Sequence, residues 1–194
     1  MRLALRRVRQ ALAAGLLLAL SAGACSAPEP QSVGPAASSL GDQDVRLVTA
    51  EAGVRPAGRV VDRAELLTAE QETALTARLE AHEKATTDQV VIVTVQSLRG
   101  LPVERFGYTL GNAWGIGRAD VDNGVLLIVA PAQRQVRIEV GMGLAQVLTD
   151  DQAAQIIGIM TPRLRAGSHF AAIEAGAAGI IAALKAKPER RRAS

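Results

Sequence analysis

Two uncharged apolar segments constrain the fold of this chain more than any other feature. They are QVVIVTVQSL at residues 89–98 and GVLLIV at residues 124–129, and neither contains a charged side chain. Successive side chains of a strand point to opposite faces of a sheet, so a strand that is apolar on both faces must be covered on both faces. The two segments therefore predict a sheet that is buried between two layers of helices.

A further strand is predicted directly after the second apolar segment. Residues 135–140 alternate between apolar and polar side chains, and a short turn at residues 131–133 precedes them. Two strands joined by so short a loop form an antiparallel hairpin. Arg137 and Glu139 lie two positions apart on one face of this strand, which predicts an ion pair on the sheet surface.

Helical periodicity is found in the segments that flank these strands. Thr68 and Gln71 have the spacing of a capping box, for a helix that runs to about residue 87. Further helices are predicted at residues 103–114, from a cap at Asp150 or Asp151 onward, and at residues 170–184, whereas residues 45–58 fit either a peripheral strand or part of a linker. The fold class is therefore α/β: an α/β/α sandwich with a central mixed sheet that contains a β-hairpin, and with helices on both faces.

The first 24 residues have the three parts of a secretory signal peptide. Four arginines precede an apolar stretch at residues 11–20, and small residues at 21–24 lead to Cys25, the only cysteine. An apolar stretch of this length is too short to span a hydrocarbon core of ~30 Å. The segment LSAGAC resembles a bacterial lipobox, although Ala22 stands where leucine is usual. Lipidation of Cys25 is predicted, and plain signal cleavage that leaves a free thiol is the alternative.

Composition predicts four parts of the chain and the class of partner. Residues 1–24 are the signal peptide, 25–58 a lipid-anchored flexible tether, 59–184 the folded domain and 185–194 a basic disordered tail. The whole chain carries +3, of which the signal peptide contributes +4 and the tail +4, so residues 25–184 carry −5. An acidic domain in a chain with only 2% aromatic residues is unsuited to nucleic acid, which is excluded as a partner.

The order of short motifs along residues 59–184 resembles the TPM domain family. The motifs are AWGIG, DNGVLLIVAP, RIEVGMGL and LTD, in that order. The family includes thylakoid-lumen proteins of photosystem II repair and exported or membrane-anchored bacterial proteins. The resemblance implies divalent-cation binding, as of calcium, in some members and acid phosphatase activity in the plant branch, and the shared fold does not choose between these roles.

Four oxygen-bearing residues are the candidate metal ligands. Asp120, Asp122 and Asn123 directly precede an apolar strand, and Asp62 lies at an acidic position of the family pattern before the first predicted helix. Carboxylate and amide oxygens are the ligands that Ca²⁺ and Mg²⁺ prefer, so these residues are predicted to converge at one rim of the sheet and to hold such a cation. Asp122 and Asn123 also fit a tight turn, and Asp62 also fits an electrostatic cap of the helix.

No nucleophile for covalent catalysis is evident, and no catalytic residue is predicted. His82 and His169 share no metal or triad spacing; His82 is expected on the solvent face of its helix. Trp114 is expected to anchor the core, and residues 141–143 to form a sharp exit from the strand before them.

These observations predict an extracytoplasmic, membrane-anchored lipoprotein, periplasmic or at the cell surface. Its expected partners are the membrane, through lipidated Cys25, and a protein at that membrane. Because no nucleophile is evident, a cation-binding interaction or assembly module for membrane protein complexes is favoured. A metal-dependent acid phosphatase that acts on phosphomonoesters is the alternative.

Overall fold

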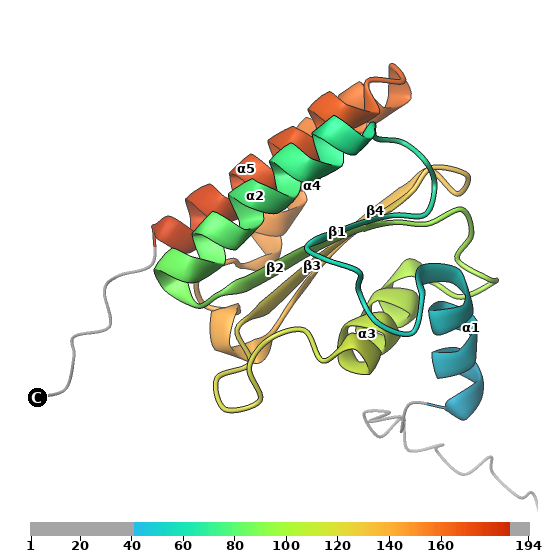
Figure 1. The fold of residues 1–194 in the computed structure, drawn as a ribbon, viewed down its shortest axis with the longest axis horizontal. Coiled ribbons are helices and arrows are strands. Elements are labelled where there is room, and N and C mark those ends of the chain that lie inside the picture. The colour runs from blue at the N-terminus through green and yellow to red at the C-terminus, as the bar shows by residue number, and fades with distance from the viewer. Residues whose placement is uncertain (1–40, 187–194) are drawn as a thin grey trace, which may run out of the picture. The chain divides into compact units, whose positions relative to one another are not determined.

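The computed structural model of the protein describes residues 41–186 (Figure 1). Its elements are α1 (Asp42–Ala52), β1 (Val60–Asp62), α2 (Ala69–Thr86), β2 (Gln89–Thr94), α3 (Val103–Trp114), β3 (Gly124–Ala130), β4 (Gln135–Val140), the short 3-10 helix η1 (Met142–Leu144), α4 (Asp150–Arg165) and α5 (His169–Lys185). Within residues 41–186, no helix combines the length and the hydrophobicity that a bilayer-spanning segment requires. The predicted signal peptide, Cys25, residues 25–40 of the predicted tether and residues 187–194 of the predicted tail lie outside the described residues.

The four strands form one mixed sheet in the order β1-β2-β3-β4. The first three strands are parallel, with Gln89 opposite Gly124, and β4 pairs antiparallel to β3, with Val125 opposite Val140. The predicted hairpin is therefore confirmed. Because β1, β2 and β3 are parallel, their carboxyl ends lie at one rim of the sheet and their amino ends at the other.

Helices cover both faces of this sheet, which confirms the predicted α/β/α sandwich. Alternate residues of β3 supply two separate cores: Leu127 packs with α2, α4 and α5, whereas Leu126 and Ile128 pack with α1 and α3. Figure 1 shows these two helix layers on opposite sides of the strands. The two apolar segments are buried on both sides, as their sequence requires.

The two helices that link parallel strands lie on opposite faces of the sheet. The connection from β1 to β2 passes through α2, and that from β2 to β3 through α3. Since the strands follow one another in a single direction across the sheet, these crossovers have opposite hands, although nearly all such crossovers in proteins are right-handed. Because the two crossovers differ in hand, one linking helix lies on each face of the sheet and helps to cover that face.

Side-chain caps begin two of the helices. The predicted capping box of Thr68 and Gln71 opens α2. At α4 the prediction that Asp150 or Asp151 is the cap is wrong, because Thr149 is the N-cap and forms a second capping box with Gln152. Both aspartates lie in the first turn of α4, where a negative charge interacts favourably with the helix dipole.

Residues 45–58 contain a helix, α1, rather than the strand or linker that their sequence suggested. Val48 and Ala52 are fully buried in the core beside α3. The buried Glu51 carboxylate accepts hydrogen bonds from the backbone N–H groups of Gln96 (2.8 Å) and Ser97 (2.9 Å), and it pairs with Arg99 at 2.7 Å. These partners are more than forty positions away in sequence, so tertiary contacts hold α1 in place.

The expectation that His82 faces solvent is wrong. Its side chain is only 4% exposed, and it lies on the same face of α2 as the buried Leu75 and Leu79. Burial lowers the pKa of His82, against a smaller raising effect of Asp88. His82 Nδ1 has no hydrogen-bond partner among the described residues.

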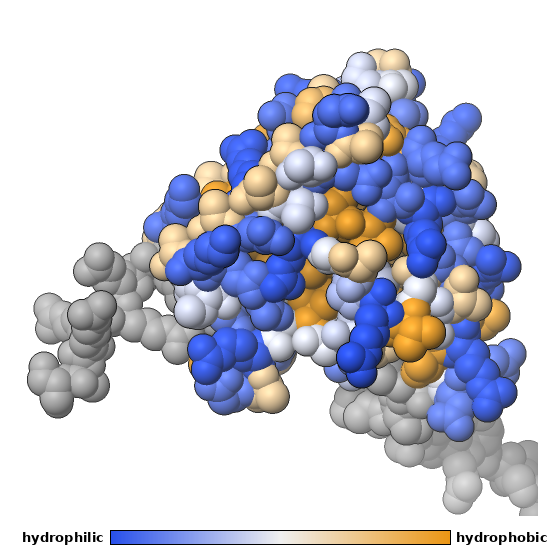
Figure 2. All heavy atoms as spheres, in the orientation of Figure 1, coloured by the Kyte–Doolittle hydropathy of each residue, from blue (hydrophilic) through white to orange (hydrophobic). Residues whose placement is uncertain are grey.

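The space-filling view shows how the two helix layers meet the sheet from one side. Hydrophobic side chains gather in a hollow over the strands, between the layers, and hydrophilic side chains surround them (Figure 2).

Trp114, as predicted, anchors the core beneath α1: it is 9% exposed, and its indole Nε1 donates to the carbonyl oxygen of Gly53 at 2.8 Å.

Candidate functional site

The predicted metal ligands lie at opposite ends of the sheet. Asp62 is the last residue of β1 and is paired with Thr94 at the end of β2, whereas Asp122 and Asn123 precede Gly124, which is paired with Gln89 at the start of β2. The five steps from Gln89 to Thr94 span roughly 16 Å of strand. The expectation that Asp62 and Asp122 converge at one rim is therefore wrong.

Asp62 organises the connection from β1 to α2. Its carboxylate accepts hydrogen bonds from the Leu67 backbone N–H at 2.8 Å and from the Thr94 hydroxyl. Glu72, in the first turns of α2, lies near enough for the two carboxylates to repel each other: burial, and then this repulsion, raise the pKa of Glu72. The structure thus gives Asp62 a local role at the start of α2, close to the predicted cap.

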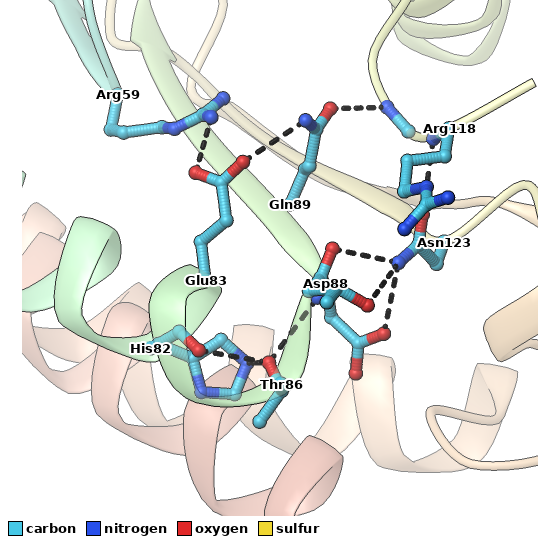
Figure 3. A network of polar contacts seen from close by, with 10 residues as sticks. Arg59, His82, Glu83, Thr86, Asp88, Gln89, Arg118 and Asn123 are labelled. Atoms are coloured by element: carbon cyan, nitrogen blue, oxygen red, sulfur yellow. Dashed lines mark hydrogen bonds and ion pairs between the residues drawn. The ribbon is translucent and has the colours of Figure 1, made fainter.

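Asn123 fastens the loop before β3 to the loop between α2 and β2. Its side chain is buried; Nδ2 donates to the carbonyl oxygen of Thr87 at 2.7 Å and to Asp88 Oδ1 at 3.2 Å, while Oδ1 accepts from the Arg118 backbone N–H at 3.0 Å. Figure 3 shows Asn123 pointing into this network. Both the oxygen and the nitrogen of the carboxamide form hydrogen bonds within the protein, as expected of a buried side chain with a structural role.

Gln89 extends the same network towards α2. Its Oε1 accepts from the Gly117 backbone N–H at 2.9 Å, and its Nε2 donates to Glu83 Oε1 at 3.0 Å. Glu83 in turn forms an ion pair with Arg59, as Figure 3 shows. Hydrogen bonds to residues of the α2–β2 region therefore fix the position of the loop of residues 115–123.

Asp120 is on the outside of this loop. Its carboxylate is exposed and pairs with Arg118 at 3.2 Å. An exposed ion pair of this kind contributes between about zero and 1 kcal/mol to stability. Asp120 is near Asp122 in sequence, but its side chain does not line the hollow described below.

Asp122 connects the loop before β3 to the chain that leaves β4. Its Oδ2 accepts from the Met142 backbone N–H at 2.7 Å, and its carbonyl oxygen accepts from the Gly143 N–H at 3.1 Å. A Cβ on Gly141 would lie 2.3 Å from the Asp122 carbonyl oxygen, and one on Gly143 would lie 1.8 Å from the Val121 carbonyl oxygen. The two glycines therefore allow a close backbone contact, and the sharp exit predicted for residues 141–143 is explained by it.

A hollow of about 620 Å³ opens beside Asp122, between α3, the loop of residues 115–119 and the end of β4. Six glycines line it: Gly107, Gly111, Gly115, Gly117, Gly124 and Gly141. The side chains of Asp122, Glu139 and Arg118 also line it, and Met142, 82% exposed, lies at its edge.

Glu139 is the second carboxylate of this hollow. Its Oε1 accepts from Arg137 Nε at 2.7 Å, which confirms the predicted ion pair on β4 and raises the pKa of Arg137. A Cβ on Gly107 would lie 2.7 Å from Glu139 Cγ, so α3 packs directly against the Glu139 side chain. Glu139 was missed as a site residue because its spacing from Arg137 was already accounted for by an ion pair on the sheet surface. Gly107 and Gly111 lie four positions apart on one helix face, and this spacing is the sequence feature that could have indicated the hollow.

The residues of the hollow fit a divalent cation only in part. Asp122 and Glu139 supply two carboxylates, which are ligands that Ca²⁺ accepts. Within residues 41–186, no three side chains of His, Cys, Asp or Glu lie close enough together to hold a metal ion. A cation bound here would therefore need backbone oxygen or water for most of its ligands.

Three solved structures resemble this fold. The N-terminal domain of a protein from P. gingivalis is 28% identical, with a TM-score of 0.61 over 73% of this chain and 88% of that one. The N-terminal domain of the cg2496 protein from Corynebacterium glutamicum is 18% identical, with a TM-score of 0.53 over 69% and 84%. The BA42 protein from the psychrophilic bacterium Bizionia argentinensis is 22% identical, with a TM-score of 0.55 over 63% and 83%. The last two similarities concern the fold alone.

No functionally curated protein matches the chain. The model of the TPM domain matches residues 60–183, which is nearly the whole of the described sandwich apart from α1. The chain belongs to the TPM domain family.

Proposed function

We propose that the protein is an extracytoplasmic, lipid-anchored binding module that takes up a divalent cation in the hollow beside Asp122 and uses this rim to assemble with a membrane protein partner. The observation that carries the proposal is the shared position of Asp122 and Glu139 on the wall of one hollow, in a part of the chain with net charge −5. Two carboxylates together attract a hard cation.

The protein's own bonds at this site leave room for such a ligand. The hydrogen bond from Met142 N–H reaches Asp122 Oδ2, and the bond from Arg137 Nε reaches Glu139 Oε1. Each carboxylate therefore has a second oxygen that accepts no hydrogen bond from residues 41–186. A cation there would join the loop before β3 to β4, and we expect it to raise the stability of this rim.

Membrane anchoring is the second part of the proposal, and it is supported by sequence alone. Cys25 follows a signal-like leader and a segment that resembles a lipobox. If this is correct, a Cys25→Ser protein moves to the soluble fraction of the cell extract. Full retention in the membrane fraction would contradict lipidation as the anchor.

The alternative is a metal-dependent acid phosphatase at the same hollow. Arg118 favours it, because an exposed guanidinium on the wall of a cation site is suited to hold a phosphate oxygen. The residues that line the hollow include no Ser, Thr, Cys or His. Hydrolysis there would use either a water molecule activated by the bound cation or one of the two carboxylates.

Cation binding is tested by the melting temperature of the full chain in Ca²⁺, in Mg²⁺ and in chelator. Asp122→Asn and Glu139→Gln remove charge but keep an oxygen that accepts the existing hydrogen bond. We expect the cation-dependent rise to be lost in both variants and to persist in the matched control Asp120→Asn, which lies in the same loop but outside the hollow. An equal rise in all four proteins would contradict the site.

The same proteins distinguish the module from the enzyme when p-nitrophenyl phosphate is the substrate. The module predicts a cation-dependent melting temperature without hydrolysis. Hydrolysis that requires the cation and is lost in Asp122→Asn would establish the phosphatase instead.

A further inference from the structure

A second hollow, of about 750 Å³, lies at the carboxyl end of β3, which is the opposite rim of the sheet from Asp122. It lies where the β3–β4 turn meets the last turns of α4 and the first residue of α5. Figure 1 shows this turn and the α4–α5 connection at the same end of the layers. Nothing in the proposed function uses this end of the molecule.

The charged residues of this hollow are two arginines. Arg134, Arg165 and His169 line it, and no Asp or Glu does. Within residues 41–186, neither arginine forms an ion pair with a carboxylate. In a region that is acidic as a whole, two cations without counter-ions in one concave place attract an anion.

The rest of the wall is apolar. Val129 and Ala130, both fully buried, form its deep part at the end of β3. The half-buried side chains of Val136, Ile157 and Leu164 line its sides. Such a surface favours the burial of hydrocarbon, because apolar area removed from water stabilises a complex by roughly 25 cal/mol per Å².

His169 also lines this hollow. Its Nδ1 is buried and has no hydrogen-bond partner among the described residues. A buried polar atom without a partner costs free energy, and a ligand that bonded to it would recover that free energy. No role for His169 could be assigned from the sequence, because its neighbours in space come from the β3–β4 turn and from α4.

We infer that this hollow binds a small organic anion that has a carboxylate or phosphate group on an apolar body. The guanidinium groups of Arg134 and Arg165 match the oxygen atoms of either group, and the apolar wall takes the body of the ligand. The volume lies within the range of about 300–1,000 Å³ that is usual for small-molecule sites.

Calorimetric titration of the full chain in lipid nanodiscs tests this inference, with heats from empty nanodiscs subtracted. The probes are hexanoate, hexyl phosphate, the neutral 1-hexanol and inorganic phosphate. We expect saturable binding of hexanoate or hexyl phosphate, and the tighter of the two identifies the acidic group. Hexanol and inorganic phosphate, which each supply half of the required chemistry, should bind at least about tenfold more weakly.

Two matched variants locate the binding. Arg134→Gln combined with Arg165→Gln should weaken the anion at least about tenfold, because charge-assisted hydrogen bonds are lost. Arg46→Gln combined with Arg55→Gln removes the same charge from exposed positions outside the hollow and should leave the affinity unchanged. The inference is overturned if neither anion binds, if hexanol binds as tightly as the tighter of the two anions, or if both double variants behave alike.

Discussion

The two rims of the sheet differ in charge, in backbone and in what holds them together. The rim before β3 has two carboxylates, six glycines and a network of buried side-chain hydrogen bonds around Asn123. The rim after β3 has two arginines that form no ion pair within residues 41–186, over an apolar wall. Parallel strands separate the two rims by the length of a strand, so one small sandwich presents two chemically opposite surfaces.

The largest expected effect comes from the glycine contact at the first rim. Gly143→Ala places a Cβ 1.8 Å from the Val121 carbonyl oxygen, so the chain after β4 must move. We expect the free energy of unfolding to fall by about 3 kcal/mol, measured by urea denaturation.

The control for this substitution is another helical glycine. Gly158→Ala in α4 meets nothing within 4 Å and should be neutral or stabilising by up to about 1 kcal/mol. Similar effects of the two substitutions would refute the claim that the Gly143 contact supports the rim.

The next largest effect is expected at the buried Asn123 side chain. Asn123→Ala leaves the Arg118 N–H and the Thr87 carbonyl oxygen without their partner, and we expect a loss of about 2–3 kcal/mol in the same measurement. Asp120→Ala, two positions beyond Arg118 and exposed, should cost less than about 0.5 kcal/mol. A large effect of Asp120→Ala would mean that the ion pair on the outside of the loop matters more than the network within it.

A pH dependence is expected from the core beside α2. Burial lowers the pKa of His82 below its ordinary value of 6.5, so the unfolded chain binds the proton more readily than the folded one. The stability associated with neutral His82 is fully present above pH 6.5 and is lost as the pH falls below it. The melting temperature of His82→Gln should therefore decline less between pH 7.5 and pH 5 than that of the unchanged protein. Parallel declines would show that other groups control the acid sensitivity.

The smallest effect is expected beside Asp62. Glu72→Gln removes a carboxylate whose pKa burial and Asp62 raise, so the variant should be slightly more stable at pH 7, by less than about 0.5 kcal/mol because solvent screens the pair. The gain should disappear at pH 4, where Glu72 is largely protonated. A loss of stability at pH 7 would mean that Glu72 makes a favourable contact there.

Much of the fold could be predicted because its causes are local. Residues 89–94 and 124–130 are apolar on both faces, which requires two helix layers, and Thr68 with Gln71 marks the start of α2. The helix α1 could not be predicted, since Glu51 is held by residues of a loop far along the chain. His82 could have been placed correctly, because its spacing from Leu75 and Leu79 puts all three on one helix face.

The candidate site was predicted less well than the fold. Asp122 was named from its motif, and the structure places it on the wall of a hollow. Asp62 was added to the same site, although it follows a strand while Asp122 precedes a parallel one; strand direction alone assigns them to opposite rims. Glu139 was missed because its closeness to Gly107 depends on how α3 packs on β4, which no local pattern encodes.

The most direct test of the central claim is a calcium titration followed by backbone amide NMR shifts of the isotope-labelled full chain. The account predicts saturable shifts at residues 115–123 and 139–143, absent in the variant that combines Asp122→Asn and Glu139→Gln, with little change at Arg134 or His169. Shifts that centre on Asp62 and Glu72, or no saturable shifts at any amide, would contradict it.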